Sequence, residues 1–164
     1  MATKQIAVQR FSVTSSKSFG AVVKALEEAI GHPDMSAFRQ NIASAKTFAD
    51  VETVVHKAIG LSDFMEFTRF DLGEILRKER GGQAPQSLRL VIGNPLIMKQ
   101  MIKHVPDAGS YAPVTILIDE RSDGVHLSYD RMASFLASYG SREALRVARE
   151  LDAKVEVLLT AAAI

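Results

Sequence analysis

Three polar side chains in the sequence could perform acid–base chemistry or hold a ligand if the fold brings them together: Asp71, His126 and Tyr129. A histidine beside a carboxylate can serve as a general base, because its ordinary pKa lies near neutral pH. Alternation along a strand places His126 on the face opposite Tyr129. A lone histidine on a strand is more often a half-exposed surface residue. A functional role and an ordinary surface position therefore both remain open for His126.

A second candidate is the tripeptide Gly93-Asn94-Pro95, where a predicted strand turns directly into a predicted helix. Free backbone N–H groups and the positive end of the helix dipole could bind an anion at such a corner. The structural alternative is that glycine makes the turn, asparagine caps the helix and proline takes its first position. The structural role is favoured, because no glycine-rich phosphate loop surrounds the tripeptide. The candidate ligand-binding residues are therefore Asp71, Gly93, Asn94, His126 and Tyr129.

The sequence lacks the residues that several kinds of chemistry require. The chain has no cysteine, which excludes disulfides, thiolate nucleophiles and cysteine-type zinc sites. Its four histidines fall on separate predicted elements, and no pair has the i, i+4 spacing of a zinc helix. A Gly-x-Ser-x-Gly elbow is also missing. We therefore predict no metal site and no cofactor.

Composition narrows the partners and the compartment. The 20 basic and 19 acidic residues are interspersed and give a net charge of +1, so we expect no nucleic-acid partner. No apolar stretch approaches the ~20 residues of a membrane span, and no secretory signal is evident. We expect a soluble, cytoplasmic protein with no membrane partner, folded as a single domain over residues 1–164.

The candidate residues must be positioned by alternating strands and helices. The pattern predicts an α+β fold in the order β-α-α-α-β-α-β-α-β-β-α-α, with a mixed, partly antiparallel sheet of about five strands. The expected strands are 5–14, 64–70, 88–92, 114–119 and 125–129. The expected helices are 17–30, 36–44, 49–59, 72–79, 95–104, 131–138 and 142–162. The unbroken apolar run 114–118 predicts a central strand covered on both faces.

The stretch 88–139 resembles the family called domain of unknown function 302. Its motifs appear here in order: a "fGNP" turn at Leu90-Val91-Ile92-Gly93-Asn94-Pro95, methionines at Met98 and Met101, a β-branched strand at 114–118, an Asp123-Gly124 hairpin and a "v.lsY" strand at 125–129. The family's Asp-His pair is replaced by Asp71-Leu72, and its Leu-Pro by Ala112-Pro113. The resemblance implies a family-like core unit at 86–139 and a small α+β fold that commonly dimerises. It implies no established activity.

Three functions remain open from the sequence. The leading hypothesis is a homodimeric module that binds a small anion or metabolite near Gly93-Asn94-Pro95, Asp71 and Tyr129. One alternative is an enzyme that uses Asp71 or His126 as the acid–base group on a small polar substrate. Another is a homo-oligomeric interaction protein that docks through the long helix 142–162.

Overall fold

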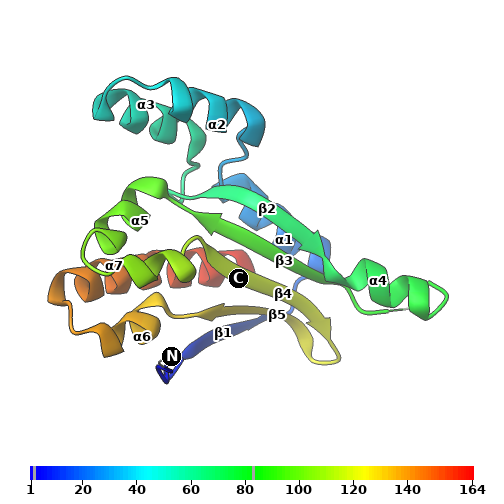
Figure 1. Cartoon of the computed structure of the whole chain (residues 1–164). Helices are drawn as coiled ribbons and strands as arrows, with labels where there is room; N and C mark the ends of the chain where they lie inside the picture. Colours follow the sequence, from blue (N-terminus) through cyan, green and yellow to red (C-terminus); the bar gives the residue numbers. More distant parts are fainter. Residues whose placement is uncertain (2, 83) are drawn as a thin grey trace.

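The computed structural model describes every residue except 2 and 83. Its elements follow the predicted order, with two short 3-10 helices added (Figure 1). In chain order they are β1 (Arg10–Ser15), α1 (Phe19–Ala29), α2 (Met35–Ser44), α3 (Phe48–Ala58), β2 (Met65–Asp71), α4 (Leu72–Glu79), β3 (Ser87–Gly93), α5 (Pro95–Ile102), η1 (Pro106–Ser110), β4 (Val114–Arg121), β5 (Gly124–Asp130), α6 (Met132–Leu136), η2 (Ala137–Tyr139) and α7 (Arg142–Ala163). The predicted α+β class is confirmed.

The strands form one sheet in the order β1-β5-β4-β3-β2, with β4 at its centre as predicted. All four pairings between these strands are antiparallel, so the expectation of a mixed sheet was wrong. The parallel contact among the described residues is an isolated bridge between Gly31 and Met65.

The first strand is shorter than the predicted 5–14. It begins at Arg10, which pairs with Asp130, the last residue of β5. None of the described residues before Arg10 belongs to a strand, and Gln9 binds the chain after β5 through its N–H, to the hydroxyl of Ser134, and its carbonyl, from the N–H of Arg131. The apolar alternation of Ile6 and Val8 therefore has no sheet to join.

One face of the sheet carries the core, and helices α1 and α7 pack against it (Figure 1). Its strand residues are almost fully buried: Leu88, Leu90, Ile92, Val114, Ile116, Ile118, Val125, Leu127 and Tyr129. The long helix α7 buries its own apolar stripe in this core, including Ala148, Leu151 and Val155. That stripe is therefore not available for docking a partner.

The opposite face, called here the open face, is much less covered. Its side chains alternate with the core residues and belong to Arg10, Ser12, Thr14, Arg89, Thr115, Leu117, His126, Ser128 and Asp130. Thr115 and Leu117 in the central strand are only partly buried. The prediction that β4 is covered on both faces was wrong, because the helices that fill the core lie on one side of the sheet.

Helices α2 and α3 form a hairpin that stands away from the sheet, above β2 in Figure 1. No residue of α2 is buried, and α3 buries only Val55 and Ala58. A capping box starts α3, because Thr47 and Asp50 exchange side-chain and backbone hydrogen bonds.

Candidate functional site

The Gly93-Asn94-Pro95 corner is occupied by its own structural contacts. Asn94 Oδ1 accepts the N–H of Leu96 at 2.9 Å, and its Nδ2 donates to the carbonyl of Asp63 at 3.0 Å. A Cβ on Gly93 would lie 3.3 Å from Pro113 Cβ, so glycine permits close packing here. The adjoining cavity of about 20 Å³ holds at most a single water. These contacts support the structural interpretation of the tripeptide.

Asp71 lies at the opposite end of the same strand pair. Its Oδ1 caps α4 by accepting the N–H of Glu74 at 2.9 Å, and its Oδ2 binds Arg77 Nη2 at 2.6 Å. The hydrogen bond from Arg77 holds the pKa of this carboxyl below its ordinary value. Asp71 faces Leu88 at the start of β3, whereas Asn94 follows its end. Six residues at 3.3 Å separate the two positions by about 20 Å.

His126 lies on the open face next to the β4–β5 hairpin. Its Nε2 is 2.8 Å from Asp123 Oδ1 and its Nδ1 is 3.5 Å from Thr14 Oγ1. This histidine therefore has an orienting carboxylate, which the sequence analysis missed although Asp123 stands only three residues away. Asp71 ends the edge strand β2, which β3 and β4 separate from β5. The two candidate acid–base residues, of which the enzyme alternative needs one, therefore do not lie side by side.

Tyr129 is buried on the covered face, with 1% of its surface exposed. Its hydroxyl donates to Asp152 Oδ1 at 2.7 Å, and the same carboxylate accepts the N–H groups of Met132 and Ala133. Burial raises the pKa of Tyr129 and that of Asp152. The sequence analysis missed Asp152, although a carboxylate within the apolar stripe of a helix is a usable signal.

The open face contains a hollow of about 330 Å³, called here the sheet-face groove. It lies over β4 and β5 and is bordered by η1 and α6. Its lining consists of Arg10, Arg89, Ser110, Tyr111, Val114, Thr115, Leu117, Ser128, Tyr129, Asp130 and Phe135. Of the five predicted site residues, only Tyr129 is among them.

The two arginines of this groove differ in charge balance. Arg10 forms a bidentate pair with Asp130 at 2.7 and 2.8 Å, and this hydrogen bonding raises the pKa of its guanidinium. Arg89 has only a 3.5 Å contact with Thr115 Oγ1 and lies 5.8 Å from the ring centroid of Phe70. Among the described residues no carboxylate lies within ion-pair distance of Arg89. The groove therefore carries one uncompensated positive charge.

The groove also has an aromatic wall, formed by Tyr111 and Phe135. Their ring centroids are 4.6 Å apart and the ring planes differ by 12°. The Tyr111 hydroxyl is 2.9 Å from the Tyr139 hydroxyl, so the polar end of Tyr111 already has a partner. What the wall presents to the groove is mainly apolar ring surface.

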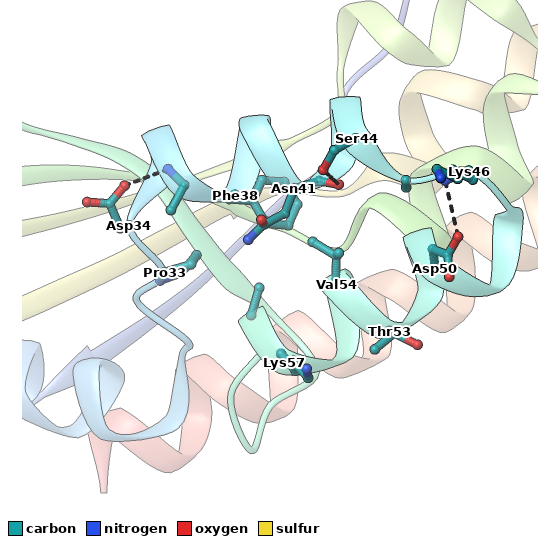
Figure 2. A pocket seen from close by; sticks show the side chains of 13 residues that line it. Pro33, Asp34, Phe38, Asn41, Ser44, Lys46, Asp50, Thr53, Val54 and Lys57 are labelled. Atoms are coloured by element: carbon teal, nitrogen blue, oxygen red, sulfur yellow. Dashed lines mark hydrogen bonds between the residues drawn. The ribbon is translucent and has the colours of Figure 1, made fainter.

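A larger hollow of about 590 Å³ lies between α2 and α3 (Figure 2). Phe38 and Val54 contribute apolar surface, and Lys46 and Lys57 lie at its border with Asp34 and Asp50. Both carboxylates bind backbone N–H groups, Asp34 that of Ala37 and Asp50 those of Lys46 and Thr47. The charges of the two lysines and the two aspartates sum to zero. This groove between α2 and α3 therefore favours neither an anionic nor a cationic ligand.

Comparison with known proteins agrees with the fold and with the resemblance in the sequence. The family model described as "Domain of unknown function DUF302" matches residues 40–162. This chain belongs to the DUF302 family. A crystal structure of an uncharacterized conserved DUF302 protein from Bacillus stearothermophilus is similar, with a TM-score of 0.64 and 12% identity over 93% of this chain and 97% of that chain. At that identity the likeness shows the fold alone. The comparison with curated proteins gave no match.

None of the described helices is both long enough and apolar enough to cross a membrane. In the same part of the chain, no group of three or more His, Asp or Glu side chains is arranged to hold a metal ion. Among the described residues, the sheet-face groove combines an arginine that has no carboxylate partner with an aromatic wall. We therefore take this groove as the candidate site.

Proposed function

We propose that this protein is a small-molecule-binding module whose ligand is a small anion held in the sheet-face groove. The observation that carries the proposal is the guanidinium of Arg89, which lines a hollow of about 330 Å³ and has no carboxylate partner in the described part of the chain. Small-molecule pockets have volumes from about 300 Å³ upward, so the groove is large enough. The proposed site differs from the predicted corner at Gly93 and Asn94, where the polar groups already have partners.

The surroundings of Arg89 suit an anion. A guanidinium presents five N–H donors in a planar fork that matches a carboxylate or a phosphate. Thr115 and Ser128 add hydroxyl donors in the same groove. The side chain of Arg89 is exposed, so its donors are accessible to a ligand that enters the groove from solvent.

The experiment is a thermal-shift screen with acetate, malonate, sulfate and phosphate, followed by calorimetry. A ligand at ten times its Kd stabilises the folded state by about 1.4 kcal/mol. We expect Arg89→Ala to abolish this gain and Arg89→Lys to keep part of it. Arg39→Ala is the matched control, because Arg39 is an exposed arginine on α2, outside the groove. Equal stabilisation of the Arg89→Ala variant would contradict the proposal.

We also propose that the protein forms a homodimer through β2 and α4. Strand β2 is an edge of the sheet, and among the described residues its outer side has backbone partners only near Met65 and Glu66, from Gly31. Helix α4 projects beyond the end of β2 (Figure 1) and exposes Leu72, Ile75 and Leu76, with Ile75 73% exposed. An edge strand can pair antiparallel with the same strand of a second copy, and such a pairing has the two-fold symmetry of a homodimer.

Light scattering after gel filtration tests the dimer. We expect the wild type to have twice the mass of the chain and Ile75→Glu to be monomeric with unchanged stability. Val157→Glu is the control, because Val157 is comparably exposed on α7. A monomeric wild type at 100 µM would contradict the dimer without affecting the anion site.

A cytoplasmic location completes the proposal. Its support is the cysteine-free sequence, which gains nothing from an oxidising compartment. Fractionation of cells that express the tagged protein would test it, and recovery in an extracytoplasmic fraction would contradict it.

A further inference from the structure

We infer that the anion of the sheet-face groove is a planar aromatic carboxylate, bound with its carboxylate at Arg89 and its ring against Tyr111 and Phe135. This inference rests on the proposed function, because it identifies the ligand class of the same groove. Three features of the lining support it: the net charge at Arg89, the aromatic wall of Tyr111 and Phe135, and the distance between Arg89 and that wall.

The charge balance favours a single negative charge. Arg10 and Asp130 neutralise each other through two hydrogen bonds, which leaves Arg89 alone with a net charge. The carboxylate of Asp130 lines the same groove and repels a second negative charge on the ligand. A carboxylate matches the planar guanidinium in a bidentate geometry and carries one charge, whereas phosphate near neutral pH carries more.

The opposite end of the groove favours a flat apolar group. The rings of Tyr111 and Phe135 are already nearly parallel, and a third ring can add to them in an offset stack or edge to face. Val114 and Leu117 provide further apolar surface between the two ends. An aliphatic polyol has no planar ring to add to this stack.

The spacing fits one or two rings. Tyr111 precedes the start of β4 at Val114, while Arg89 is paired with Leu117 three residues further along. Three residues of strand span about 10 Å, and the side chain of Arg89 leans back toward Thr115. A benzoate or a naphthoate bridges this distance. A dinucleotide exceeds a groove at the lower end of the usual range of volumes.

The test compares matched ligands by calorimetry on the full chain. The probes are benzoate, 2-naphthoate, cyclohexanecarboxylate and benzamide. We expect benzoate or 2-naphthoate to bind about three- to tenfold more tightly than cyclohexanecarboxylate, since an aromatic contact contributes about that factor. Benzamide should bind at least tenfold more weakly, because it lacks the charge that pairs with Arg89.

Two variants locate the contacts. Phe135→Leu keeps the wall apolar and should remove the preference for benzoate over cyclohexanecarboxylate, whereas Phe48→Leu, at an exposed ring on α3, should leave it intact. Arg89→Ala should weaken every carboxylate at least tenfold. A cooperative thermal unfolding transition of each variant would show that the variant is folded.

The outcomes separate the two proposals. If acetate and cyclohexanecarboxylate bind through Arg89 as tightly as benzoate, the anion site stands and the aromatic inference is wrong. If no anion binds, both are wrong. Aromatic acids whose affinity is unchanged in both Arg89→Ala and Phe135→Leu would also overturn the inference, because they would be bound elsewhere.

Discussion

The two faces of the sheet use neighbouring residues of the same strands in different ways. On β5, Tyr129 points into the core and its hydroxyl binds Asp152, while the next residue, Asp130, points to the open face and binds Arg10. On the covered face polar groups serve stability, and no buried side-chain nitrogen or oxygen in the described part of the chain lacks a hydrogen-bond partner. On the open face Arg89 keeps donors without an ionic partner. A sheet covered on one side can therefore separate the residues that fold it from those free to bind.

The largest expected difference between the faces is in apolar packing. Ile116 and Leu117 are adjacent on β4, but Ile116 is fully buried and Leu117 only partly. We expect Ile116→Ala to lower the free energy of unfolding by about 2–5 kcal/mol, because it leaves a cavity. Leu117→Ala should cost about 1 kcal/mol. Equal losses in urea titrations would show that the open face is covered in solution.

The two aspartates give the next comparison. Asp152→Ala removes the acceptor of the Tyr129 hydroxyl and of the Ala133 N–H, and it leaves the Met132 N–H only its 3.2 Å bond to the Tyr129 hydroxyl. We expect a loss of about 3 kcal/mol. Asp130→Asn breaks a largely exposed ion pair and should cost about 1 kcal/mol or less. Denaturant unfolding measures both. A loss for Asp130→Asn as large as that for Asp152→Ala would contradict the division between the faces.

Substitutions in the Gly93-Asn94-Pro95 corner should lower stability and leave anion binding unchanged. Asn94→Ala removes the cap of α5 and the bond to the Asp63 carbonyl, for a loss of about 1 kcal/mol. Asn94→Ser keeps a side-chain oxygen that can accept the N–H of Leu96 and should lose less. Anion affinity measured by calorimetry should stay as in the wild type for both variants. Weaker binding in Asn94→Ser, with its stability retained, would return the corner to the candidate site.

The smallest effect is a pH dependence that belongs to the covered face. Burial raises the pKa of Asp152 above 3.8, and its hydrogen bonds offset part of this rise. The folded state then binds more protons than the unfolded state between the two pKa values, so stability falls as the pH rises through that window. We expect the unfolding free energy of the wild type, relative to Asp152→Asn, to decrease from pH 3.8 up through the raised pKa and to be constant above it. A relative stability that rises over the same interval would show that hydrogen bonding outweighs burial.

The candidate site was less predictable than the elements around it. Asp71, Asn94 and the Thr47–Asp50 box are helix caps formed within a few residues of chain, and each could be identified from the sequence. Whether Asp71 and Asn94 meet depends on the direction in which β2 pairs with β3. The antiparallel pairing places them at opposite ends, so the cluster predicted from types and spacing does not form.

The sequence by itself determined the order of strands and helices, the helix caps and the family, because periodicity, capping and turn chemistry act between residues near in the chain. Only the tertiary structure decided that the sheet is antiparallel, that helices cover one face, and that Asp152 reaches Tyr129 across 23 residues. It also placed Arg89, which has no carboxylate partner among the described residues, in one groove with the rings of Tyr111, which follows η1, and Phe135 of α6. Those features depend on contacts between distant segments, whose positions are fixed only when the whole core packs.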